Sequence, residues 1–193
     1  MESPLEFPSR SDKHLHAWPK VVILLMLMAA SLGAVGDGTP VGEYQLKAVF
    51  LFNFAKFVEW PPQAFADTRD PFTICVLGDN PFGSALDDAT RGRTVANRPI
   101  AIRLVSNLPQ ARACQILFVS ASERNRMHSI LEALRNSCVL TVGDTEDFTA
   151  NGGIVQFRMK DARVRIEIDA EAAGRANLRI SSRLLSLVEP ARH

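Results

Sequence analysis

Short apolar runs and longer helical stretches alternate along the middle of the chain. Four runs have the length and the apolar, partly β-branched content of buried strands: 72–77, 100–105, 115–119 and 139–142. Helical patterns lie between them, one opening at Asn80-Pro81 and running to about Ala89, another at 122–136. Strands separated by crossover helices favour a mostly parallel sheet flanked by helices, so the predicted fold class is α/β.

The C-terminal part has a different pattern. Residues 154–160 and 163–169 alternate strictly between apolar and polar positions around Asp161-Ala162, which predicts an antiparallel hairpin with one wet face. Two short helical pieces follow, at 170–176 and 181–188. The apolar positions of the hairpin are expected to face the core; they are Val155, Phe157, Met159, Val164, Ile166 and Ile168.

The first helical pattern after the N-terminal apolar run extends from Tyr44 to Trp60, where Pro61-Pro62 stop it. Its few polar residues are spread around the helix and do not share one stripe. A helix that is apolar nearly all round is either central to a core or half-covered by a partner. Both interpretations stay open.

An export signal precedes this region. Lys13 and Lys20 come before the apolar run 21–35, which is shorter than the ~18 residues of a spanning helix. We therefore predict a signal peptide at 1–36, a linker at 37–42 and one domain at 43–190. An uncleaved membrane anchor is the alternative.

Composition narrows the function classes. The 193 residues carry a net charge of only +1 and contain no basic block, which argues against a nucleic-acid partner. Three cysteines are present, Cys75, Cys114 and Cys138, and in an oxidising compartment one pair usually forms a disulfide. They form no recognisable metal-ligand set with the histidines, so no metal and no cofactor is predicted.

Candidate catalytic groups do not assemble into a site. The segment Gly78–Gly83 superficially resembles a phosphate loop, but Pro81 removes a donor, and a turn with a helix cap explains the pattern. The serines lack a Gly-x-Ser-x-Gly elbow, and His128 is expected on a solvated helix face. Asp144 and Asp147 read as turn residues. The chain is therefore predicted not to be an enzyme.

The polar face of the hairpin is more informative. A two-residue turn sets Lys160 beside Arg163 and Arg158 beside Arg165, and like charges directly opposite are unfavourable unless an anion or acidic partner covers them. A solvated face whose long stems shield the sheet is the competing interpretation. The residues alone do not decide between the two.

Several segments together resemble the YfiR family, in order and over essentially the whole predicted mature chain. The opening helix 44–61 is closely similar, and so are the segments 75–83, 114–120, 139–144, 152–154, 164–168 and 178–185. The resemblance implies a periplasmic repressor that holds a membrane-bound diguanylate cyclase inactive through the periplasmic sensor domain of the cyclase. It also implies a homodimer, and a disulfide between Cys75 and Cys114 that makes the activity redox-sensitive.

From the pattern and the resemblance together we expect a partner- or ligand-binding surface on the hairpin and the C-terminal segment. Its expected residues are Arg158, Arg163, Arg165, Glu167, Leu178, Ile180 and Leu184. The alternative is a periplasmic protein that binds a small ligand near the hairpin and has no cyclase partner. A third class, an exported hydrolase, would need Asp144 or Asp147 beside a nucleophile.

Overall fold

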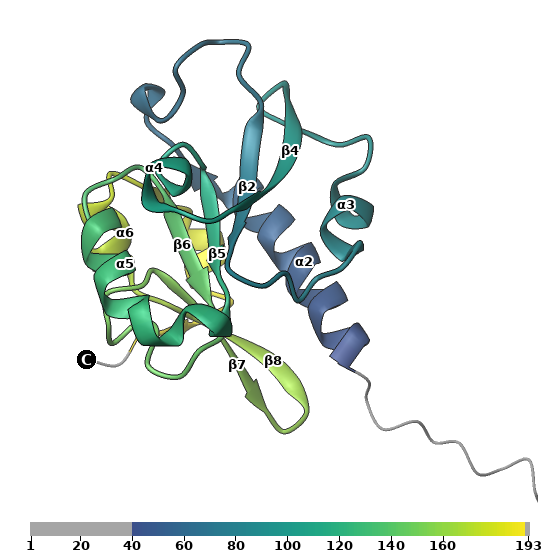
Figure 1. The fold of residues 1–193 in the computed structure, drawn as a ribbon, viewed down its shortest axis with the longest axis vertical. Coiled ribbons are helices and arrows are strands. Elements are labelled where there is room, and N and C mark those ends of the chain that lie inside the picture. The colour runs from purple at the N-terminus through teal and green to yellow at the C-terminus, as the bar shows by residue number, and fades with distance from the viewer. Residues whose placement is uncertain (1–39, 192–193) are drawn as a thin grey trace, which may run out of the picture. The chain divides into compact units, whose positions relative to one another are not determined.

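A computed structural model describes residues 40–191 (Figure 1). The predicted signal peptide, and the linker up to residue 39, lie outside the described residues. The helices are α2 (Pro40–Phe57), α3 (Ala85–Thr90), α4 (Leu108–Ala111), α5 (Met127–Leu134), α6 (Ala170–Arg175) and α7 (Ser182–Leu185), with 3-10 turns η1 (Pro62–Ala64) and η2 (Ala121–Arg126). The strands are β1 (Val58–Glu59), β2 (Phe72–Leu77), β3 (Thr94–Val95), β4 (Arg98–Val105), β5 (Ile116–Val119), β6 (Leu140–Gly143), β7 (Val155–Lys160), β8 (Arg163–Ile168), β9 (Arg179–Ile180) and β10 (Glu189–Pro190).

The larger sheet has eight strands in the order β10-β8-β7-β6-β5-β2-β4-β3. Neighbouring strands from β4 through β7 pair in parallel, and β8 returns antiparallel to β7. The predicted α/β class, with a mostly parallel sheet and an antiparallel C-terminal hairpin, is therefore confirmed.

A separate apolar layer covers each face of this sheet. On one face α2 and α3 pack over a large cluster that includes Phe54 and Phe118. On the other face α5 packs over a smaller cluster that contains both Cys75 and Cys114. β2 contributes to both clusters because alternate residues of a strand point to opposite faces, which is why all six of its residues are buried.

The predicted helix 122–136 consists of the 3-10 turn η2 followed by α5, which ends at Leu134. Two further helix boundaries were wrong. α2 ends at Phe57 and not at Trp60, because Val58–Glu59 leave the helix and pair with Ile180 and Arg179 of β9. This extended backbone lets the Trp60 indole Nε1 donate a hydrogen bond to the Gln115 carbonyl, 3.1 Å away. A long-range strand pairing of this kind leaves no mark in local periodicity.

The other boundary lies after β2. Asn80 does not cap a helix, because its Oδ1 accepts a hydrogen bond from the Phe82 amide 3.0 Å away and closes a turn. The following residues continue as turn, and α3 begins only at Ala85. Asn stabilises local turns as readily as helix starts, so the sequence pattern alone was ambiguous.

Phe148 anchors the segment between β6 and β7. Its ring is fully buried and lies between Gly143, at the end of β6, and Gly153, just before β7. A Cβ atom on either glycine would collide with the ring. The absence of two side chains therefore creates the space that holds this loop, and the hairpin after it, against the sheet.

Candidate partner-binding hairpin

The β7–β8 hairpin has the two-residue turn that the sequence predicted. Arg158 lies opposite Arg165 and Lys160 opposite Arg163, in the expected register. Both turn residues have positive φ, 51° at Asp161 and 55° at Ala162, the conformation that a tight hairpin turn with right-handed strand twist requires. Ala162 adopts it without the freedom of glycine.

The charged face of this hairpin is open to solvent. Arg158, Lys160, Arg163 and Arg165 are all exposed, and they form four successive positions of one positive ladder. The hairpin extends beyond the rest of the sheet (Figure 1), so these side chains stand away from the body of the protein. A projecting strip of positive charge is suited to an acidic surface on a partner.

The opposite face of the hairpin is only partly in the core. Phe157 is buried as predicted, but Met159 is 49% exposed, and Val164 and Ile166 are half-buried. The expectation that all six apolar positions face the core was therefore wrong for Met159. The outer half of the hairpin is thus less covered on this face than its base.

At the base of the hairpin the polar positions are buried instead. Glu167 is 5% exposed, and its carboxylate accepts hydrogen bonds from the Thr149 hydroxyl at 2.5 Å and the Arg158 guanidinium at 3.2 Å. Gln156 accepts from the same Thr149 hydroxyl at 3.1 Å. Glu167 therefore positions Arg158 and ties the hairpin to the 148–151 loop; its own carboxylate is not available to a partner in this conformation.

The predicted C-terminal residues lie mostly inside the protein. Leu178 is 3% exposed and Leu184 is 8% exposed, and both belong to the larger core cluster. Ile180 is half-buried and pairs with Val58 through β9. These residues support the surface around the first helix, whereas the accessible members of the predicted set are Arg158, Arg163 and Arg165.

The exposed side of α2 carries apolar residues that were not predicted as part of a site. Leu46 and Val49 are 44% and 45% exposed, and the half-buried Phe50 contacts Phe157 of the hairpin with tilted rings whose centroids are 6.1 Å apart. Phe50 thus connects this side of α2 to the buried base of the hairpin. The sequence feature that could have indicated this side is the lack of a polar stripe on the helix. One side of α2 faces the core, and the other is open.

A charged network lies at the carboxyl end of β6. The Asp144 carboxylate accepts from Lys47 Nζ at 2.7 Å and from the Tyr44 hydroxyl at 2.9 Å, and Lys47 also contacts Glu43 at 2.5 Å. The Lys47 side chain is 3% exposed. Burial, followed by the hydrogen bond and charge of Asp144, raises the pKa of Tyr44 above its ordinary value. The network joins α2 to the sheet by charge.

The surroundings of Asp144 and Asp147 differ from those that the hydrolase alternative requires, in which one of them lies beside a nucleophile. Asp144 is already engaged by Lys47 and Tyr44, while Asp147 is exposed in a turn with φ 56°. His128 lies on the exposed side of α5, as predicted. Within residues 40–191 no group of three His, Cys, Asp or Glu side chains is placed to hold a metal ion.

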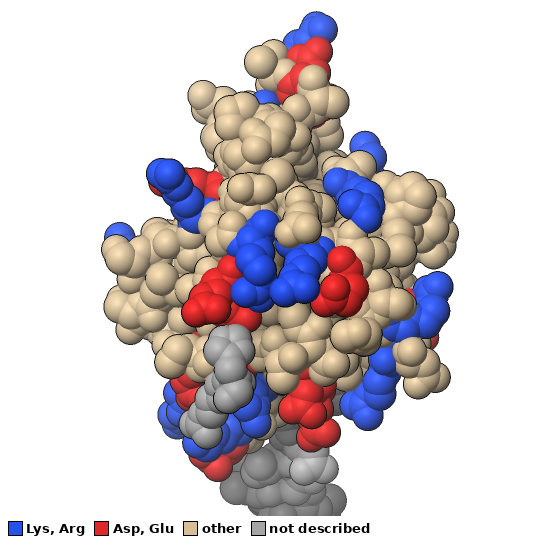
Figure 2. Space-filling model, turned by 90° about the vertical axis from the view of Figure 1, so that its left-hand side faces the viewer, with Lys and Arg blue, Asp and Glu red and all other residues tan. Residues whose placement is uncertain are grey.

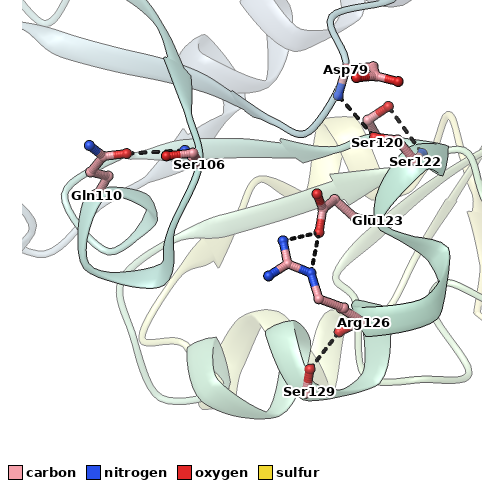
Figure 3. A network of polar contacts seen from close by, with 8 residues as sticks. All are labelled: Asp79, Ser106, Gln110, Ser120, Ser122, Glu123, Arg126 and Ser129. Atoms are coloured by element: carbon pink, nitrogen blue, oxygen red, sulfur yellow. Dashed lines mark hydrogen bonds and ion pairs between the residues drawn. The ribbon is translucent and has the colours of Figure 1, made fainter.

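The junction of β2 and β5 is the topological switch point of the sheet, where open α/β folds commonly bind ligands. Here η2 fills it (Figure 3). The Ser122 hydroxyl accepts from the Asp79 amide at 2.9 Å, and Gly78 leaves no room for a side chain against Ser122 and Glu123. Glu123 in turn pairs with Arg126 at 2.5 Å. The amide that a phosphate would need is thus already satisfied, so the turn interpretation holds.

The predicted cysteine pair is bonded. Cys75 in β2 and Cys114 before β5 form a disulfide with Cα atoms 6.0 Å apart, 39 positions apart in sequence. Both residues are buried, at 0% and 3% exposure. Cys138 is free and half-buried, and burial raises the pKa of its thiol.

Open grooves lie away from the hairpin. One of about 350 Å³ is bounded by α5, α6 and the loop 149–152, and Arg135, Arg175, Glu132 and Glu171 line it. On the side that carries α5 and α6, basic and acidic side chains lie next to one another (Figure 2). This groove does not present a charge of one sign that would select an ionic ligand.

Comparison with known proteins identifies the class. The model of the YfiR/HmsC-like family matches residues 44–189, so the chain belongs to this family. No curated protein matches the sequence. Eight chains of solved structures match. One is the crystal structure of a conserved domain protein from Vibrio cholerae O1 biovar El Tor, with 10% identity and a TM-score of 0.49, over 63% of this chain and 55% of that chain. The chain thus spans about half the length of that protein.

Within the part of the chain that the structure describes, no helix combines the length and the apolar character of a membrane span.

Proposed function

We propose that this protein is a periplasmic regulator, exported by its predicted signal peptide, that represses a membrane-bound diguanylate cyclase by binding the periplasmic sensor domain of the cyclase. Membership of the YfiR/HmsC-like family carries the proposal. The buried disulfide supports an oxidising compartment, since disulfides persist there and are rare in the cytosol. The protein acts by binding and, in this proposal, catalyses no reaction.

The binding surface is the outer half of the β7–β8 hairpin together with the open side of α2. The hairpin offers a positive ladder of Arg158, Lys160, Arg163 and Arg165 on one face and the exposed Met159 on the other. Charges of one sign steer encounter and orientation, and an adjacent apolar surface supplies buried area. Binding biases the cyclase toward its inactive state by the difference in affinity for its two states.

Redox sensitivity follows from where the disulfide lies. A reductant cannot reach sulfurs that are 0% and 3% exposed until the surrounding layer opens, so reduction requires local or global unfolding. Once the bond is broken, the chain loses the constraint on a 39-residue separation, worth about 4 kcal/mol in the chain-entropy model. Reduction therefore releases the cyclase by lowering the amount of folded repressor.

The test reverses charge on the exposed ladder. Arg163→Glu and Arg165→Glu should lower co-purification with the cyclase from membranes and raise cellular cyclic di-GMP, while circular dichroism stays native. Arg124→Glu on η2, an exposed residue away from the hairpin, is the matched control and should keep repression. If the folded ladder variants repress as well as the control, the hairpin assignment is wrong. A protein that binds no cyclase under any condition would favour the small-ligand alternative.

A further inference from the structure

The outer edge of β4 is available for pairing over most of its length. β4 lies beside β2, and on its other side β3 pairs only with Arg98 and Pro99 (Figure 1). From Ile100 to Leu104, no strand in the described part of the chain pairs with this edge. Unpaired backbone donors and acceptors along an edge are a template for another strand.

The side chains of this edge do not protect it. Ile100 and Ile102 pack against the core on the same face as α2, and Leu104, next on that face, is 64% exposed. Ala101 and Arg103 lie on the other face. Edge strands that stay single are commonly blocked by prolines, by charges that point inward or by bulges. Here the only proline of the strand, Pro99, is already covered by Thr94.

We propose that this edge is a homodimer interface, in which β4 pairs antiparallel with β4 of a second copy of the chain about a twofold axis centred on Ile102. The inference goes beyond the proposed function and does not depend on cyclase control.

Geometry selects this register. A twofold axis perpendicular to the sheet keeps each face on its own side, so residues that lie opposite one another must point to the same face. One residue of β4 must therefore lie opposite its own copy, and this residue is the centre of the pairing. Centring on Arg103 would set two guanidinium groups directly opposite one another, which is unfavourable. Centring on Ala101 would require pairing at Pro99, where Thr94 already lies. Centring on Ile100 meets the same obstacle, and centring on Leu104 would set Ile102 opposite residue 106, beyond the end of β4 at Val105. Ile102 is the centre that uses the whole free stretch 100–104.

In this register the two edges are complementary. Leu104 lies opposite Ile100 of the partner subunit, and Ile102 lies opposite Ile102 of the partner subunit, so three apolar pairs form one ladder and cover the exposed leucine. On the other face Ala101 leaves space for the long side chain of Arg103 of the partner subunit. The pairing ends where β3 begins, which limits it to residues 100–104 of each copy.

The test uses the mature chain and measures its mass by sedimentation equilibrium. Leu104→Lys should weaken the dimer at least about tenfold, the equivalent of about 1.4 kcal/mol. Ala101→Glu should tighten it, because each added carboxylate would lie opposite Arg103 of the partner subunit. Leu187→Lys is the matched control, since Leu187 is 78% exposed and remote from β4, and should leave the dimer unchanged.

A crosslinking experiment tests the register. In a Cys138→Ala background, Ile102→Cys should form a covalent dimer on mild oxidation, and Leu104→Cys alone should not. Ile102 faces away from Cys75, whose paired residue on β4 is Arg103, so the native disulfide is not in competition. A wild-type chain that is monomeric at all concentrations would overturn the inference. So would a dimer that Leu104→Lys leaves intact. Neither result depends on whether the protein represses a cyclase.

Discussion

The Tyr44 hydroxyl donates a hydrogen bond to the Asp144 carboxylate across 2.9 Å, and Tyr44 is the only tyrosine in the sequence. Its titration can therefore be followed without ambiguity by tyrosinate absorbance. Burial is the first cause of its raised pKa, and the hydrogen bond and charge of Asp144 come next.

We expect the native protein to show little tyrosinate at the pH near 10 where a free tyrosine is half-ionised. Asp144→Asn should move the titration partway back toward that value, because burial remains. Since the folded pKa is raised, the contribution of neutral Tyr44 to stability is fully present below about pH 10 and is lost as pH rises through the folded pKa. Tyr44→Phe is the blank; ordinary titration in the native protein would contradict the network.

Lys47 depends on the same carboxylate. Its side chain is 3% exposed and lies 2.7 Å from Asp144, so Lys47→Met leaves a carboxylate of 10% side-chain exposure without its main cation. Breaking one side of a buried pair costs about 3 kcal/mol or more in unfolding free energy. The double variant Lys47→Met/Asp144→Asn should recover part of that loss.

Urea denaturation of the two single variants and the double variant measures the coupling directly. The control is the surface pair Arg91–Asp88, 76% and 54% exposed in its side chains, where Arg91→Ala should change stability by less than about 0.5 kcal/mol. Equal losses in the buried and exposed variants would show that the network contributes nothing specific.

The local sequence pattern was sufficient to predict the strands and the hairpin turn, but not which side chains form the surface. The run Phe72–Leu77 and the alternation on either side of Asp161 were read correctly, because strand period and turn chemistry are local properties. The family resemblance implied the Cys75–Cys114 bond, and the structure contains it.

The exposure of individual side chains was harder to predict from the sequence than the strands themselves. Met159 and Glu167 occupy regular positions of the hairpin, yet the apolar residue is 49% exposed and the acid 5%. The difference arises because Thr149, from a separate loop, covers the base of the hairpin, whereas the residues of the tip are exposed. Which side of an all-round apolar helix is open depends in the same way on the elements that pack against it.

Replacing both bonded cysteines by alanine tests the disulfide. Cys75→Ala/Cys114→Ala should lower the free energy of unfolding by about 4 kcal/mol, because the unfolded chain regains the freedom of the closed loop. Urea unfolding measures the loss, and Cys138→Ala is the control with the bond intact. A loss below about 1 kcal/mol would remove the basis for redox control through folding.

The packing around Phe148 gives a further prediction. Gly153→Ala places a methyl group against a ring that is fully buried, and overpacking of this kind costs about 1–3 kcal/mol. Gly174→Ala is the matched control. An added Cβ at this α6 position meets nothing within 4 Å, so alanine should stabilise the helix by up to about 1 kcal/mol. Thermal unfolding should shift in opposite directions; a shared direction would contradict the assigned packing.

Ala162 is the residue at which the hairpin carries backbone strain. Its φ of 55° lies in the left-handed region, which costs an L-residue with a Cβ about 1–2 kcal/mol relative to glycine. Ala162→Gly removes that cost in the folded state but increases the freedom of the unfolded chain, so a net gain of about 0.5–1 kcal/mol is expected. Ala162→Val should destabilise instead, because a β-branched side chain fits this region poorly. Both changes leave Arg158 and Arg165 in place, so the stability difference can be measured by urea unfolding while cyclase binding is compared separately. Equal stability of the glycine and valine variants would mean that residue 162 does not hold positive φ in solution.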